Sequence, residues 1–213
     1  MHTGLDRTVT GIAAAVRMVL SACFVWALGA APVCAQLYAK PVITPEAVYQ
    51  MDGYTVLAPP GAGWFEMKRA RDYLYFGKRL SSPTHSFIAV ALSAPAGGPY
   101  ADAEAFRAHV VNQITENAAD ERNKVALAAA EVDSASGPFC VRYQTRTEDR
   151  GAVGARGQSL LTETFGVSCL HPEHNELAID VSYTERGLPT ETGTTLRDEG
   201  ERFVRSLAFT PRR

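Results

Sequence analysis

The chain has 213 residues, a net charge of −2 and 46% hydrophobic residues. A chain of this length buries enough surface to fold as one domain without a metal or a disulfide. The weak net charge excludes a strongly basic nucleic-acid-binding protein and gives no sign of an acidic partner. We therefore predict no nucleic-acid partner, and no motif indicates a cofactor.

The N-terminal segment has the order of a secretory signal. Arg17 precedes an uncharged apolar run over 18–31, and small residues follow, with Val33 and Ala35 at positions −3 and −1 of a cleavage site. The apolar run is shorter than the about 20 residues that a membrane span needs. We therefore predict cleavage before Gln36 and a periplasmic or secreted protein.

A lipoprotein signal is the alternative interpretation of this segment. The tetrapeptide that ends at Cys23 resembles a lipobox, in which the cysteine is lipidated and anchors the protein to a membrane. Arg17 leaves little apolar sequence before Cys23, and residues 24–26 are apolar where a polar tether is expected. A membrane contact is expected only if Cys23 is lipidated.

The chain divides into a signal peptide over 1–35, a leader over 36–52 and a single globular domain over 53–213. Within the leader, Thr44 is placed to cap a single helical turn. Strands are predicted from short β-type runs at 54–58, 63–67, 73–76, 86–92, 139–147, 160–170 and 177–183.

Two helices interrupt these strands. The first begins after Asp102 and ends near Asn117, and the second follows Thr195 with an apolar stripe that reaches Leu207. The segment 124–132 is ambiguous, because its alanines permit a helix while its position favours a strand. The run 86–92 has apolar residues on both faces, so we expect it to be central in the sheet.

Strands in runs, rather than in strict alternation with helices, predict an α+β fold with a mostly antiparallel sheet and two main helices packed on it. This order resembles the PsbP/Mog1-like α-β-α sandwich family. The resemblance rests on Gly53-Tyr54 opening a strand, the turn from Pro59 to Trp64, and the helix that ends at 203–207. It implies a module for interaction or assembly rather than a catalyst. A loop at 150–157 departs from the family pattern.

Cys140 and Cys169 are the cysteines that remain after the signal, and an exported protein favours a disulfide between them. Pairing them places the centre of the hairpin inside the loop at 150–157. Alternation, however, puts Cys140 opposite the apolar face of its strand and Cys169 on the apolar face of its own. A β-bulge at Gly166 is one way to restore the register.

His171 and His174 form an H-x-x-H pair in a polar turn and are the candidate metal ligands. An ordinary surface turn is the competing interpretation, because a zinc site needs more ligands and Cys169 is expected in the disulfide. A metal-assisted hydrolase that uses these histidines is the alternative function.

Aromatic and basic residues are dense between 64 and 76 and form the candidate binding surface. Its members are Trp64, Lys68, Arg69, Arg71, Tyr73 and Tyr75. Core packing of the rings and a solvated strand edge are the competing interpretations. No catalytic motif is present, and Asp180 has no partner that the sequence reveals. We therefore predict a binding module for an envelope protein or a cell-wall component.

Overall fold

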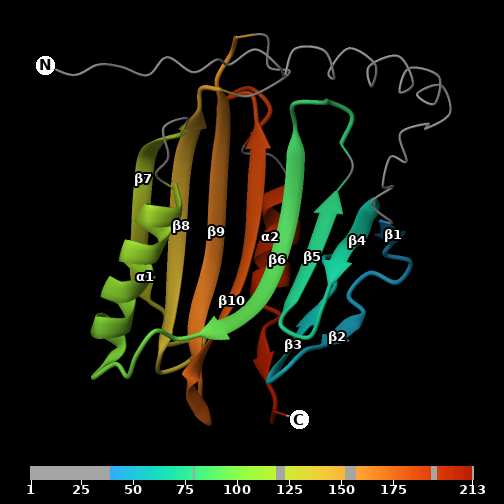
Figure 1. The fold of residues 1–213 in the computed structure, drawn as a ribbon. Coiled ribbons are helices and arrows are strands. Elements are labelled where there is room, and N and C mark those ends of the chain that lie inside the picture. Colours follow the sequence, from blue (N-terminus) through green and yellow to red (C-terminus); the bar gives the residue numbers. More distant parts are fainter. Residues whose placement is uncertain (1–38, 79, 119–122, 152–156, 193–195, 213) are drawn as a thin grey trace, which may run out of the picture. The chain divides into compact units, whose positions relative to one another are not determined.

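An eight-stranded antiparallel sheet runs through the part of the chain that the structure describes (Figure 1). The computed structural model describes residues 39–78, 80–118, 123–151, 157–192 and 196–212. The strand order is β1-β4-β5-β6-β10-β9-β8-β7. These strands are β1 (Lys40–Pro41), β4 (Trp64–Arg69), β5 (Tyr73–Lys78), β6 (Ser86–Pro95), β7 (Asn123–Val132), β8 (Cys140–Asp149), β9 (Leu160–His171) and β10 (His174–Gly187).

Two helices and a small second sheet pack on this large sheet. The helices are α1 (Ala103–Ala118) and α2 (Leu196–Val204). The small sheet has the order β11-β3-β2, with β11 (Ala208–Phe209), β3 (Tyr54–Leu57) and β2 (Val48–Gln50). The helices lie on opposite faces of the large sheet, with α1 over β7 and β8 and α2 over β10 (Figure 1). This arrangement confirms the predicted α+β fold class.

The larger hydrophobic core lies between the sheet and α2. Because α2 presents Phe203 and Val204 on one side, both side chains enter this core together with Trp64 and Tyr183 of the sheet. Small β2 and β3 complete the layer, since the ring of Tyr49 packs edge-on against Phe76 at 5.0 Å. Burial of so many large side chains makes this face the main source of stability.

The smaller core lies under α1. Asp102 caps this helix, because its Oδ1 accepts a hydrogen bond from the Ala105 amide at 2.8 Å. Phe106 and Val110 then fall on one helical face and pack against Val141 of β8. The predicted start and end of this helix are confirmed, and the ambiguous segment that follows it is strand β7.

The leader predicted over 36–52 is wrong in part, because its described residues belong to the fold. β1 pairs with the edge of β4, and β2 pairs with β3. The segment after Thr44 is a tight turn instead of a helical turn, with Glu46 at a φ of 59°. The signal over 1–35 and Cys23 lie outside the described residues. No helix in the described ranges is long and apolar enough to cross a membrane.

The predicted disulfide between Cys140 and Cys169 is present. The two residues are directly opposite in the β8–β9 register, which runs without a bulge. The bulge predicted at Gly166 is therefore wrong. The alternation conflict came from assuming one apolar face per strand, whereas β8 is covered by α1 on one face and lines the larger core on the other.

Candidate functional site

One part of the sheet carries apolar side chains on a face that no described helix covers. On this side of the sheet α1 packs over β7 and β8, and the ribbon in front of β5 and β6 is bare (Figure 1). We call this region the open face. Its side chains are Lys68 of β4, Tyr73 and Tyr75 of β5, and Ile88, Val90 and Leu92 of β6.

The register assembles the open face from alternate residues of neighbouring strands. Tyr73 pairs with Leu92, and Tyr75 lies between Lys68 and Val90. Side chains of a strand alternate between faces, so these residues share the face opposite the buried Phe76. The open face is therefore set by the strand pattern and not by a loop conformation.

Three of the predicted binding residues meet on the open face. The rings of Tyr73 and Tyr75 pack edge to face with centroids 5.6 Å apart. The Lys68 ammonium lies 4.7 Å from the centre of the Tyr73 ring, and its contact with that tyrosine raises the Lys68 pKa. Tyrosine is enriched at protein interfaces, and the Lys68 ammonium adds a cation–π contact to this pair of rings.

The other three predicted residues lie elsewhere. Trp64 is buried in the larger core. Arg69 lies over the Tyr49 ring at 5.1 Å on the opposite side of the sheet. Arg71 forms an ion pair with Asp52 at 3.3 Å. For Trp64 the competing interpretation, core packing, is the correct one.

The two histidines do not converge on a common metal position. His171 is buried, its Nε2 lies 3.0 Å from the Thr210 carbonyl oxygen, and its Nδ1 accepts a hydrogen bond from the Glu173 amide. His174 lies 3.5 Å from Glu176. Both ring nitrogens of His171 are therefore occupied by the backbone, and the residue fastens the C-terminal segment to β9. Among the described residues, no cluster of three or more potential ligands is placed to hold a metal.

A pocket of about 250 Å³ lies where α1 meets the sheet, beside the open face. Asp180 of β10 lies in it, paired with Leu92 in the register of the sheet. The Tyr143 hydroxyl donates a hydrogen bond to Asp180 Oδ1 at 2.9 Å, and the Ser182 hydroxyl also contacts the carboxyl group. Burial raises the pKa of Asp180 to about 6 and outweighs the two hydroxyl groups, which lower it.

Gly166 makes this contact between strands possible. It lies between Tyr143 and Ser182 in the registers of β8, β9 and β10. A Cβ at this position would stand 2.6 Å from the hydroxyl end of the Tyr143 ring. Because Gly166 has no side chain, the ring of Tyr143 lies across β9 and reaches Asp180 on the strand beyond.

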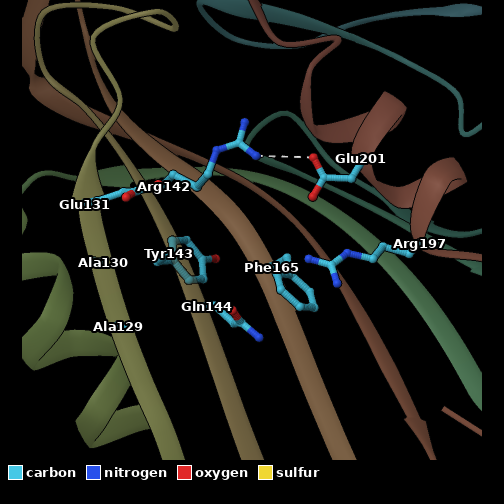
Figure 2. A pocket seen from close by; sticks show the side chains of 9 residues that line it. All are labelled: Ala129, Ala130, Glu131, Arg142, Tyr143, Gln144, Phe165, Arg197 and Glu201. Atoms are coloured by element: carbon cyan, nitrogen blue, oxygen red, sulfur yellow. Dashed lines mark hydrogen bonds and ion pairs between the residues drawn. The ribbon is translucent and has the colours of Figure 1, made fainter. Parts of the chain in front are cut away.

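A second pocket, of about 300 Å³, lies on the other face, between α2 and strands β7 to β9 (Figure 2). Its two guanidinium groups already have partners. Arg142 binds Glu201 at 3.2 Å, and Arg197 lies over the Phe165 ring at 4.4 Å. These contacts hold α2 against the sheet, so we interpret the residues around this pocket as structural.

The sequence did not reveal the Asp180 pocket. Alternation places Asp180 on the opposite face from Ile179, but it does not show that α1 returns over that face. Neither does it show that Tyr143 crosses a neighbouring strand. A usable signal was Asp180 as the one carboxylate in the alternating segment 177–183, together with a glycine at 166 in the adjacent strand.

Comparisons with known proteins give a distant likeness in fold. No protein-family model matches the chain, and no curated protein matches it significantly. Among solved structures it is similar to the Ran-binding protein Mog1p of Saccharomyces cerevisiae, over 78% of this chain and 97% of that one, with 9% identity and a TM-score of 0.42. It is also similar to a point mutant of Mog1, over the same shares, with 8% identity and a TM-score of 0.44.

These values establish no family and no function for the chain. The PsbP/Mog1-like resemblance is compatible with the α+β architecture described above. Membership of that family stays a prediction.

Proposed function

We propose that this chain is an exported, non-catalytic binding module whose open face docks onto a protein partner in the cell envelope. The observation that carries the proposal is strand β6, which has apolar side chains on both faces although the described elements cover only one face at Ile88 and Val90. Phe87 and Ala89 enter the larger core, while Ile88 and Val90 belong to the open face.

A strand with apolar residues on both faces is typical of sheets that are covered on both sides. An antiparallel sheet with one solvated face normally alternates apolar with polar residues. The half-buried Ile88 and Val90 therefore have the character of residues that a partner covers. Contiguous apolar patches bordered by polar groups mark protein interaction sites, and Lys68 and the two tyrosine hydroxyl groups supply such a border here.

Export belongs to the same proposal. A signal over 1–35 is supported by its order of charged, apolar and small residues. The Cys140–Cys169 disulfide supports an oxidising compartment, because such bonds are rare in the cytosol. N-terminal sequencing of the exported protein tests the cut before Gln36, and labelling with a radioactive fatty acid tests lipidation of Cys23.

The docking proposal is tested by site-specific photo-crosslinking in cells that express the full chain. A photo-reactive phenylalanine replaces Tyr75 on the open face. The matched control replaces Leu127, an apolar residue of β7 with 38% of its surface exposed. We expect one discrete protein adduct from position 75 and none from position 127.

A second variant shows whether the adduct depends on the apolar face. Val90→Lys places a charge beside position 75 without entering the buried core. We expect it to remove the adduct while circular dichroism stays unchanged. Equal labelling from positions 75 and 127, or an adduct that survives Val90→Lys, would contradict docking on the open face.

A further inference from the structure

The acidic side chains of the large sheet differ in whether a basic group faces them. The most buried ones all have a basic partner: Asp149 contacts Arg186 at 2.6 Å, Glu163 contacts Arg146, and Glu185 contacts His85 at 2.8 Å. Buried charges in proteins are generally paired in this way.

Asp180, which is half-buried in the same sheet, has no such partner among the described residues. Its contacts are the neutral hydroxyl groups of Tyr143 and Ser182, and no ion pair within the described residues includes it. His109 also lines this pocket, but its described ring contacts are with Tyr100 and Phe106 and not with the carboxylate. A ligand with a positive charge would supply the counter-ion that Asp180 lacks among the described residues.

We propose that the pocket under α1 binds a protonated amine on a short apolar stem, with Asp180 as its counter-ion. The charge selects for a cation, and the hydroxyl groups of Tyr143 and Ser182 fix the position of the carboxylate that receives it. An anion is excluded by the carboxylate. A neutral alcohol makes a weaker hydrogen bond than an ammonium group does.

The residues that line the pocket determine which apolar stem of the ligand fits. Leu92, Phe106 and Val110 line it with apolar surface, and His109 adds one polar ring from α1. A volume of about 250 Å³ is below the usual range for drug-sized ligands, so the pocket suits an amine with a linear chain of a few carbons. Burial of the stem then adds to the ion pair.

The electrostatic state of Asp180 agrees with this role. Burial raises its pKa to about 6, which shows that the protein alone solvates the charged form poorly. An ammonium group in contact would favour the charged form and lower that pKa. Binding of an ammonium group and ionisation of Asp180 therefore favour each other.

The test uses n-pentylammonium as the probe and the mature disulfide-bonded protein, titrated at pH 8 and followed by two-dimensional NMR. We expect saturable binding with a dissociation constant on the order of 1 mM, as suits a ligand of six heavy atoms. The shifted resonances should be those of residues around Asp180. n-Pentanol, which is neutral and of equal length, should bind at least about tenfold more weakly.

Two variants separate the ion pair from the cavity. Asp180→Asn keeps the size of the side chain and should weaken pentylammonium binding about 10- to 100-fold. Ala178→Leu keeps Asp180 but fills the pocket that Ala178 lines, and it should abolish binding. Either variant is sufficient if the other fails to fold. No saturation at 50 mM, or unchanged affinity in a folded variant, would overturn the proposal.

The amine can come from a free small molecule or from a lysine side chain of a partner. N-acetyl-lysine methylamide, whose only amine is that of the side chain, distinguishes the two. Binding of both probes supports a lysine side chain as the source, and binding of pentylammonium alone supports a free amine. The result is independent of docking on the open face, because amine binding does not require the adduct at position 75.

Discussion

Replacement of Asp180 by asparagine should stabilise the protein at neutral pH, although it removes a hydrogen-bonded charge. Burial raises the pKa of Asp180 from 3.8 to about 6. Each pKa unit corresponds to about 1.4 kcal/mol, so keeping this carboxylate ionised above pH 6 costs the fold at most about 3 kcal/mol. Asparagine is neutral at every pH and can still accept a hydrogen bond from Tyr143.

The sign follows from proton binding. Between pH 3.8 and about 6 the folded protein holds a proton on Asp180 that the unfolded chain has released, so the free energy of unfolding falls as the pH rises through this window. Because the residue is partly open to its pocket, we expect Asp180→Asn to raise the free energy of unfolding by about 1–2 kcal/mol at pH 7.5. Below pH 4 the two proteins should be nearly equal.

Urea unfolding at pH 3.5 and pH 7.5 measures this difference through the midpoint, provided that the slope with denaturant is unchanged. Repeating it in a His109→Asn background removes the other titratable side chain that lines the pocket from α1. Asp52→Asn is a control of opposite sign, since the hydrogen bond from Arg212 lowers the Asp52 pKa and its charge stabilises the fold. A gain from Asp180→Asn that is the same at both pH values would refute the reasoning.

Three further changes test other parts of the structure by the same unfolding assay. Gly200→Ala should lower stability by about 1–2 kcal/mol despite its better helix propensity, because the new Cβ overlaps the buried Tyr183 ring; a higher midpoint would contradict this. Replacing both Cys140 and Cys169 by alanine should lower the free energy of unfolding by about 3 kcal/mol, because their separation of 29 residues closes a long loop. A loss below about 1 kcal/mol would contradict this prediction. Asp102→Ala removes the cap of α1 and should cost about 1 kcal/mol, whereas Asp102→Asn, which keeps an accepting oxygen, should cost little.

The positions of the strands could be predicted because the signal for a strand is local. The alternation over 177–183 predicts β10, and the apolar run over 86–92 predicts β6. In both cases only the ends of the strand are misplaced. The pairing of Cys140 with Cys169 could also be predicted, because it centres the predicted hairpin on the sequence 150–157. Alternation could not show that both faces of β8 are covered, because α1 covers one of them only through tertiary packing.

The same difference between local signals and long-range contacts applies to the candidate site. Tyr73 and Tyr75 lie two residues apart in one strand, so the pattern alone puts them on one face. The prediction that Trp64 lies at the surface is wrong, because its burial depends on α2. Glu199 of this helix is 135 residues away in the chain and accepts a hydrogen bond from the indole of Trp64. Asp180 and Tyr143 meet only through a third strand, which no local rule connects.

The two faces of the sheet differ in how their side chains are packed and paired. On the α2 face, charges are paired, large side chains interlock, and Glu199 binds both Trp64 and Lys78, so this layer accounts for the stability of the fold. On the α1 face, Asp149 and Arg186 still form an ion pair, but the described residues leave Ile88 and Val90 of β6 without a cover and Asp180 without an ion pair. Departures from good packing and charge pairing tend to gather at functional sites, because function and not stability maintains them. If Val90→Lys and Asp180→Asn both leave the protein as stable as before or more so while they remove binding, function is the reason that this face keeps an apolar patch and an unpaired charge.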